Sequence, residues 1–376
     1  MLRKYPIGLQ SFRKIREGGY VYIDKTEIIH RLIKTGQYYF LSRPRRFGKS
    51  LLVDTIEELF KGSKELFEGL WIYNNWDWNI AHPVIRFSFA NIGIKTRGLE
   101  AAINGALEEN ANRLGIALTK VNYDLRFREL IEKAAQKGNV VILIDEYDKP
   151  IIDFLDEPKL MEGNRSVMKN FYSILKDSDR HIRFLLMTGV SQFSHVSVFS
   201  DLNNLRNITL VSKFAAIVGI TQTELEENFA SEIQELKKQR PDILTQIKDW
   251  YNGYTWDMLS WVYNPFSLLN FMDEPKFRNY WFASGTPSFI ARQLKKEGVY
   301  DMENIQLGES ALSTFEADNP NPGSLLFQTG CLTIKDISPS GQVYQLGFPN
   351  REVRNSLLDG VPNTYRGVYP SGSIAH

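Results

Sequence analysis

The sequence has little that would suit a secreted or zinc-binding protein. Cys331 is the one cysteine among 376 residues, so no disulfide can form within the chain. Nothing around it supplies a base, so we expect a buried thiol rather than a catalytic one, as is typical of the reducing cytoplasm. The five histidines show no ligand spacing with cysteine or acidic residues, which leaves a structural zinc site without support.

Long apolar runs and an excess of one charge are missing too. No stretch approaches the roughly 20 apolar residues that span a bilayer, and no signal-peptide run follows the basic N-terminus. The net charge is +1, so any contact with nucleic acid or an acidic membrane needs a local patch. We therefore expect a soluble, cytoplasmic protein without a membrane segment.

What is present is an alternation of buried strands and helices. Hydrophobic residues make up 43% of the chain, enough to build cores. We expect helices over 51–60, 99–114, 123–137 and 166–175. We expect strands over 38–41, 84–92, 140–144 and 182–187, with weaker candidates at 208–211 and 215–218. The fold class is thus α/β, a P-loop NTPase-like parallel sheet flanked by helices, with ligands at the carboxyl ends of its strands.

The texture divides the chain into three parts. We expect a P-loop core over residues 1–220. At Thr221 a strongly helical stretch begins, with Glu224 three residues on as a capping box, and an aromatic-rich region follows; we expect a small helical lid over 221–300. The helical spacing of Trp250, Tyr251 and Tyr254 favours core packing over stacking on bases. Residues 301–376 form a strand-containing C-terminal region.

A phosphate-binding loop is predicted between the first strand and the helix after it, in the segment LSRPRRFGKS. Backbone N–H groups at such a helix start converge on one point, and the helix dipole favours an anion there. Gly48 lets the backbone come close, Lys49 is placed to reach the β- and γ-phosphates, and the Ser50 hydroxyl to bind Mg²⁺.

The match to G-x-x-x-x-G-K-[ST] is imperfect, because Arg43 stands where the first glycine would be. Either the loop keeps its shape with that side chain pointing out, or the phosphates sit less deeply. The neighbouring Arg45 and Arg46 either balance the triphosphate from a solvated loop or touch a phosphate directly, that of a nucleotide or of a nucleic acid.

An acidic pair ends the strongest strand candidate, VVILI. Asp145 is placed to share the Mg²⁺ shell with Ser50, and Glu146 to polarise the water that attacks the γ-phosphate. Asp148 has either a supporting or a surface role.

One further strand candidate, 84–92, lies between the two motifs, which is typical of ATPases rather than nucleotide kinases. The strand over 182–187 should then lie between the other two in space. Thr188 and Ser191 after it are candidates for sensing the γ-phosphate or the water, and a plain strand-to-loop turn explains them equally well.

Several longer segments resemble the bacterial AAA-ATPase-like family, related to AAA+/STAND P-loop ATPases. They include YIDKTEIIHRLIKTGQYYFLSRPRRFGKSLL, VILIDEYDKP, MTGVSQFSHVSVFSDLNNL, WYNGYTW and YWFASGTPSF, and the resemblance extends from about Tyr5 to about Asn355. Arg43 is the family's own habit, so it does not imply an inactive loop. ATP rather than GTP is implied by the resemblance, and no guanine-reading Asn-Lys-x-Asp motif is present.

The resemblance implies a Walker A site at Gly48, Lys49 and Ser50, and Walker B acids at Asp145 and Glu146. Asn264-Pro265 resembles the G-x-P element that contacts the base in related ATPases. We place the nucleotide contacts at Arg45, Arg46, Phe47, Gly48, Lys49, Ser50, Leu51 and Pro265, the metal ligands at Ser50 and Asp145, and the catalytic groups at Lys49, Glu146 and Thr188.

Many relatives continue into a nuclease-like domain of the PD-(D/E)xK type. Here LGFPNREVRNSLL resembles the lead-in, and no Asp with a downstream Glu-x-Lys follows, so we expect no nuclease activity.

Two functions from different classes stay open. The first is an ATPase whose hydrolysis drives a conformational change, with a protein partner or a homo-oligomer. The second is a nucleotide-dependent interaction protein with little turnover, which acts on nucleic acid in one variant. Arg183 and Arg206 lie in the part of the chain where an arginine finger would be, and the sequence does not choose between them.

Overall fold

The central element of this computed structural model is a parallel β-sheet. The structure describes residues 3–90, 92–193, 204–281, 304–312, 314 and 321–360, the side chains of 358–360 excepted. Five strands lie in the order β2-β3-β4-β1-β5, and every neighbouring pair is parallel. Their bounds are β1 Tyr38–Ser42, β2 Val84–Ser88, β3 Val140–Asp145, β4 Ile182–Gly189 and β5 Arg206–Asn207.

The strand order confirms the predicted topology. β4 lies between β1 and β3, with Leu41 beside Thr188 and Ile144 beside Met187. Every residue of β1 and β3 is buried, as expected for strands covered on both faces. The carboxyl ends of β1, β3 and β4 therefore meet at one edge of the sheet.

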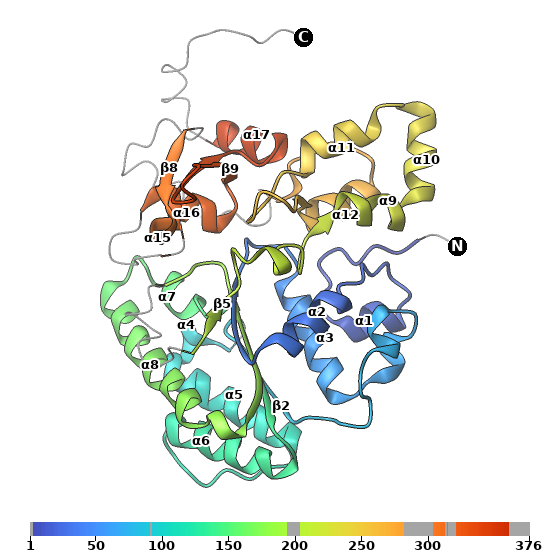
Figure 1. Ribbon diagram of the computed structural model, residues 1–376. Helices are drawn as coiled ribbons and strands as arrows, with labels where there is room; N and C mark the ends of the chain where they lie inside the picture. The colour runs from blue at the N-terminus through green and yellow to red at the C-terminus, as the bar shows by residue number, and fades with distance from the viewer. Residues whose placement is uncertain are drawn as a thin grey trace.

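Helices cover both faces of the sheet (Figure 1), and alternate side chains of β2 show which helices lie where. Arg86 points to α3, where its guanidinium bonds to Asp54, whereas the ring of Phe87 packs on those of Phe127 in α6 and Phe171 in α8. The first face carries α1 Phe12–Glu17, α2 Thr26–Thr35 and α3 Lys49–Lys61. The second carries α5 Leu99–Leu114, α6 Tyr123–Ala134 and α8 Pro158–Asp177. Short turns of helix are α4 Ile94–Arg97, α7 Lys149–Ile152, η1 Lys64–Phe67, η2 Trp71–Asn74, η3 Ala135–Lys137, η4 Asp179–His181 and η5 Ser212–Phe214.

The outer edge of β2 is satisfied by a side chain. Asn110 of α5 accepts from the backbone N–H of Arg86 at 2.9 Å and donates to its carbonyl at 2.9 Å. The edge strand therefore has a partner there in place of another strand, which protects it from pairing with a second chain.

The two weak strand candidates are corrected. The fifth strand is Arg206–Asn207, upstream of the expected 208–211, and 215–218 form no strand. The carbonyls of Thr209 and Ala215 accept instead from the guanidinium of Arg43, at 2.9 and 3.4 Å. A side chain far away in the sequence thus takes the place of a neighbouring strand.

The helical stretch after Thr221 begins as expected. Thr221 and Glu224 form the predicted capping box, with Glu224 N to Thr221 Oγ1 at 3.2 Å and Thr221 N to Glu224 Oε2 at 2.8 Å. The helices are α9 Gln222–Asn228, α10 Ala230–Gln239, α11 Ile243–Tyr251 and α12 Pro265–Asp273, beside a two-stranded sheet of β6 Ile220–Thr221 and β7 Val262–Tyr263. We call residues 221–281 the lid segment.

The aromatic residues of the lid segment are mainly core. Tyr251 and Tyr254 are buried, as the packing interpretation requires, and Trp250 packs against Tyr251 and Phe277. Trp261 is the exception, with an exposed fraction of 37%.

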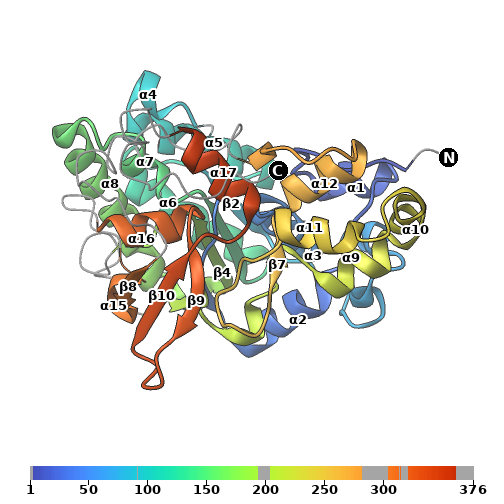
Figure 2. The same cartoon turned by 90° about the horizontal axis from the view of Figure 1, so that it is seen from above.

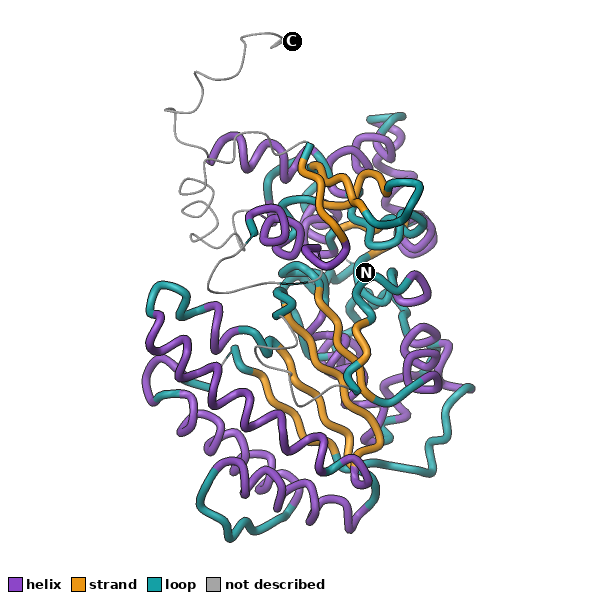
Figure 3. The backbone as a smooth tube through the Cα atoms, turned by 60° about the vertical axis from the view of Figure 1, so that its left-hand side comes forward, coloured by secondary structure: helices purple, strands orange, loops and turns teal. Residues whose placement is uncertain are grey.

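The described residues from 304 to 360 form a small α+β unit beside the lid segment, and both lie over the carboxyl end of the main sheet (Figures 2 and 3). Its sheet has the order β8-β10-β9. The bounds are β8 Ile305–Gly308, α15 Glu309–Leu312, α16 Pro322–Thr329, β9 Thr333–Ile337, β10 Val343–Gly347 and α17 Arg351–Gly360. We call the described residues 304–360 the C-terminal unit. Its Cys331 is buried and unpaired, as expected, and burial raises the pKa of the thiol to about 12.

The last part of the expected lid, residues 282–300, and the tail after 360 lie outside the described residues. Within the described part of the chain, no helix is long and apolar enough to cross a bilayer.

Candidate nucleotide-binding site

The predicted loop runs from the end of β1 at Ser42 to the start of α3 at Lys49. Gly48 has a φ of 94°, a left-handed conformation in which a side chain is strained, and Arg46 adopts it at 68°. Arg43 has no positive φ, so its backbone does not require glycine. This is how the loop makes its turn with a side chain at the first-glycine position.

The side chain of Arg43 is directed into the protein and is buried. Its guanidinium donates to the carbonyls of Ser42 and Thr209, each at 2.9 Å, and lies 3.9 Å from the ring centroid of Trp256 in the lid segment. Burial lowers its pKa to about 9, against the opposing effect of Asp257. Arg43 therefore supports the loop from beneath instead of lining the phosphate side.

Lys49 is held by the loop itself. Its Nζ donates to the carbonyl of Arg43 at 2.8 Å and to that of Pro44 at 2.9 Å. Burial lowers the pKa of this ammonium, and the charges of Asp145 and Glu146 oppose that shift. The ammonium thus lies close to the acidic pair, with its hydrogen bonds made to groups of the loop.

The two acids lie at the same edge of the sheet. Asp145, the last residue of β3, is buried, and Thr188 at the end of β4 donates to its Oδ1 at 2.6 Å. Glu146 follows in a left-handed conformation with a φ of 53°. Burial raises the pKa of Glu146, and the neighbouring Asp145 adds to this. Thr188, the predicted sensor, and Asp145, the predicted metal ligand, are thus brought together by a hydrogen bond.

Asp148, whose role the sequence left open, is buried. Its Oδ2 accepts from the N–H groups of Val190 at 3.0 Å and Ser191 at 2.7 Å, and the hydroxyl of Tyr147 donates to the Ser191 carbonyl at 2.8 Å. Because a Cβ at Gly189 would come within 2.6 Å of the Tyr147 ring, only glycine fits there. Tyr147 and Asp148 thus fix the segment after Thr188. In the sequence, the position of both residues directly after the acidic pair was the indication that they belong to the site.

The loop borders two hollows that share part of their lining. The first, of about 340 Å³, is lined by Arg45, Arg46, Lys49, Ser50, Glu146 and Lys149 and by the segment 6–10. The second, of about 100 Å³, is largely apolar and is lined by residues that include Tyr22, Ile23, Phe47, Leu52, Val218 and Ile220. Pro6, Gly48, Leu51, Pro265 and Leu269 line both. We call these two adjacent hollows together the cleft, the first its cationic end and the second its apolar end.

The nucleotide contacts expected at 45–51 and at Pro265 all line this cleft. Pro265 begins α12, and Asn264 is its N-cap, since its Oδ1 accepts from the N–H groups of Phe266 and Ser267. Phe266 also lines the cleft, with the guanidinium of Arg46 4.8 Å from its ring centroid. Asn264 therefore shapes the lid element instead of contacting the cleft.

The segment 6–10 was missed, because a short loop carries no periodic pattern. Neither arginine-finger candidate lines the cleft as the structure describes it. Arg183 lies at the opposite end of β4 from Thr188, and Arg206 is exposed on the edge strand β5.

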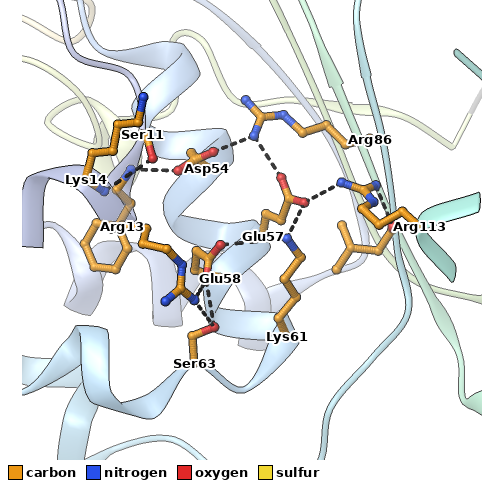
Figure 4. Close-up of polar contacts among 12 residues, drawn as sticks. Ser11, Arg13, Lys14, Asp54, Glu57, Glu58, Lys61, Ser63, Arg86 and Arg113 are labelled. Atoms are coloured by element: carbon orange, nitrogen blue, oxygen red, sulfur yellow. Dashed lines mark hydrogen bonds and ion pairs between the residues drawn. The ribbon is translucent and has the colours of Figure 1, made fainter. Parts of the chain in front are cut away.

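A network of ion pairs and hydrogen bonds joins α3 to α1, β2 and α5 (Figure 4). Asp54 accepts from the backbone N–H of Phe12, the first residue of α1, at 2.7 Å, and from Arg86 at 2.6 Å. Arg86 also bonds to Glu57 at 2.8 Å, and Glu57 to Arg113 at 2.9 Å. The helix that begins at the phosphate loop is thereby fixed to α1, to the edge strand β2 and to α5.

Comparisons with known proteins identify the family of the chain. Residues 6–199 match the model of a family described as AAA-ATPase-like, "Predicted AAA-ATPase". The chain belongs to the AAA-ATPase-like family. A relative from Azotobacter chroococcum mcd 1, named "Uncharacterized protein in vnfD 5'region", is 44% identical over 367 residues, which is 96% of this chain and 70% of the relative. The matched range of the AAA-ATPase-like model contains the loop, the acidic pair and Thr188, whereas the lid segment and C-terminal unit are covered by the similarity to that relative.

Proposed function

We propose that this AAA-ATPase-like protein binds ATP with Mg²⁺ in the cleft and hydrolyses it to drive a conformational change. The observation that carries the proposal is the two-ended cleft at the carboxyl edge of the sheet. Its cationic end suits a triphosphate and its apolar end suits a nucleobase.

The roles follow from position. Backbone N–H groups at the start of α3 and the side chains of Arg45 and Arg46 would bind the phosphates. Lys49 would exchange its bonds to the Arg43 and Pro44 carbonyls for bonds to the β- and γ-phosphates. The ammonium would have hydrogen-bond acceptors both before and after the exchange, so neither state leaves its charge unpaired.

Ser50 and Asp145 provide the hydroxyl and carboxylate oxygens that Mg²⁺ prefers, and this donor set fits the metal. Bound there, the metal would neutralise charge between the phosphates. Thr188 orients the Asp145 carboxylate through the 2.6 Å hydrogen bond. Glu146, whose pKa is raised by burial, would accept the proton of the attacking water.

We propose further that the chain divides into a core over 1–220, a lid over 221–300 and a C-terminal region over 301–376, and that it acts in the cytoplasm with a protein partner or as a homo-oligomer. A second function, a nucleotide-dependent switch with little turnover, is favoured by one observation. The phosphate loop is hydrogen-bonded to the lid segment, the part that would move in a switch, since Trp281 Nε1 donates to the Arg45 carbonyl at 3.2 Å. Action on nucleic acid has no such observation in its support.

Titration with ATP and Mg²⁺, followed by measurement of phosphate release, tests the proposal. We expect the wild type to bind and release phosphate, Glu146→Gln to bind with turnover at least 100-fold lower, and Lys49→Ala to lose binding. Arg240→Ala, an exposed residue that lines neither hollow, is the control and should behave as the wild type. Binding without turnover in every condition favours the switch, and wild-type binding no better than that of Lys49→Ala contradicts both functions.

A further inference from the structure

Lys25 is a buried cation at the apolar end of the cleft that the proposed chemistry does not use. It lines the smaller hollow among mostly apolar side chains, and its exposed fraction is 8%. Burying an ammonium is expensive unless it is paired and hydrogen-bonded, so its presence there calls for a reason.

Its partner comes from the lid segment. The Nζ of Lys25 lies 2.6 Å from both carboxylate oxygens of Glu224, 199 residues further along the chain. Lys25 precedes α2 of the core, and Glu224 lies in the first turn of α9, where it also closes the capping box with Thr221. The pair therefore joins core and lid beside the cleft.

The pair leaves one donor over. An ammonium has three N–H donors, and two of them are used by the two oxygens of Glu224. Within the described residues, the structure gives the Lys25 ammonium no acceptor other than the two oxygens of Glu224. The carboxylate oxygens, which are acceptors only, take bonds from Lys25 and from the backbone N–H of Thr221. What the pair offers a ligand is thus a donor.

We propose that Lys25, oriented by Glu224, donates a hydrogen bond to a ring nitrogen of the purine base and so makes base recognition part of the contact between core and lid. This inference rests on the proposed function, since it requires a nucleotide with its phosphates at the opposite, cationic end. Among the other side chains of the smaller hollow, Tyr22 and Thr55 carry hydroxyls, which lie 3.4 Å apart, and the rest provide van der Waals contact, which does not distinguish a base from another flat apolar group.

The test compares ATP with inorganic tripolyphosphate, which has the phosphates and lacks the base. Both are titrated with Mg²⁺ into the full chain by calorimetry. The variant is the double substitution Lys25→Met/Glu224→Gln, because Lys25→Met alone would leave a buried carboxylate without its counter-charge. We expect the double variant to bind ATP at least 10-fold more weakly and tripolyphosphate as the wild type does, as the loss of one charged hydrogen bond implies.

A matched control is available in the same molecule. Arg3 and Glu232 form another ion pair between the N-terminal segment and a lid helix, with the two atoms 2.7 Å apart, and neither residue lines the cleft. Arg3→Met/Glu232→Gln should bind both ligands as the wild type does. An equal loss of ATP affinity in this control would mean that the effect comes from loosening the lid, and would overturn the assignment.

The remaining outcomes also decide. Unchanged ATP affinity in the Lys25→Met/Glu224→Gln variant, or equal losses for ATP and tripolyphosphate, overturns the role of Lys25. A wild type that binds neither ligand refutes the proposed function itself, which keeps the two failures apart. Among 1-, 3- and 7-deaza-ATP, the analogue that lacks the accepting nitrogen should bind the wild type more weakly than ATP does, and its affinity should fall no further in the variant. If none of the three analogues behaves in this way, the proposal is overturned.

Discussion

Arg43 occupies the position where the common phosphate-loop motif has glycine, and it does so without a positive φ. Its guanidinium bonds to three backbone carbonyls, at 2.9, 2.9 and 3.4 Å, and packs on Trp256. The residue that seemed to weaken the motif is a buried support of the loop.

Arg43→Gly, which restores the common motif, should therefore destabilise the protein. It leaves buried carbonyls without donors and a cavity under Trp256, and we expect a loss of about 2–4 kcal/mol in the free energy of unfolding. Urea denaturation without nucleotide measures this. Arg45→Ala in the same loop is the control and should stay within about 0.5 kcal/mol of the wild type; equal stability of Arg43→Gly would refute the supporting role.

Glu352 of α17 is a buried acid that links the C-terminal unit to the lid segment. Its Oε1 accepts from the backbone N–H of Trp281 at 2.7 Å and from the Ser267 hydroxyl at 3.0 Å. Its Oε2 has no hydrogen-bond partner among the described residues. Burial raises the pKa of this carboxyl to about 7.

The sign of the resulting pH dependence follows from that direction. The folded protein keeps the Glu352 proton to higher pH than the unfolded chain, so stability falls as pH rises from about 4.5 to about 7. Glu352→Gln removes this titration and keeps the accepting oxygen. We expect its free energy of unfolding, relative to the wild type, to be about 2–3 kcal/mol higher at pH 8 than at pH 5. Urea titrations at both pH values measure it, and equal differences would contradict the prediction.

At the scale of elements, the site depends on where parallel strands end. β3 and β4 are neighbours, and their carboxyl ends bring Asp145 and Thr188 into a 2.6 Å hydrogen bond. Tyr147 and Asp148 then tie the turn after β3 to the segment after β4. The two strand ends therefore behave as one unit.

Thr188→Val keeps the shape of the side chain and removes its hydroxyl. With the Asp145 carboxylate no longer oriented, we expect phosphate release to slow by about 10–100-fold, while ATP affinity changes by less than about 3-fold. Thr188→Ser, which retains the hydroxyl, should stay close to the wild type. Single-turnover measurements give both quantities, and equal rates for the Val and Ser variants would exclude an orienting role for the hydroxyl.

The elements that the sequence predicted well are those set by local pattern. Leu99–Leu114 is helical over the expected range, and the buried run before Asp145 is the strand between β2 and β4. The placement of Gly48, Lys49 and Ser50 at the start of the helix after β1 is local in the same sense, because a turn and a helix start are encoded by adjacent residues.

The features that could not be predicted depend on residues far apart in the chain. Residues 215–218 form no strand, and the Ala215 carbonyl accepts from the distant Arg43. The partner of Lys25 is likewise invisible, because Glu224 carries its own local signal as a capping residue. Periodicity reports which face is buried and says nothing about which distant side chain fills it.

At the scale of the whole molecule, the phosphate loop lies between three parts of the chain. Phe47 packs edge-on against Tyr254, with ring centroids 4.8 Å apart, and the Tyr254 hydroxyl donates to the Gly330 carbonyl at 3.2 Å. Gly330 in turn lies against Pro44, and an added Cβ would come within 2.7 Å of the proline ring. The C-terminal unit thus contacts the loop directly.

Gly330→Ala should therefore weaken nucleotide binding. Its φ of 87° strains any side chain, and the new methyl would push on Pro44. Gly341→Ala is the matched control, because Gly341 has a φ of 72° and open space around its Cβ position. We expect both to lose about 1 kcal/mol of stability, with a further loss for Gly330→Ala alone, and ATP affinity to fall at least 5-fold in Gly330→Ala alone. Titration calorimetry and thermal unfolding of both variants measure this. Unchanged ATP affinity in both would show that the contact between Gly330 and Pro44 does not affect nucleotide binding.

The contact between Gly330 and Pro44 has a thermodynamic consequence of its own. Coupling between two sites is reciprocal, so a nucleotide that tightens this contact must itself be held more tightly, by the same factor, whenever the contact is reinforced. A macromolecule that binds the C-terminal unit and reinforces this contact would then raise the nucleotide occupancy of the loop without entering the cleft.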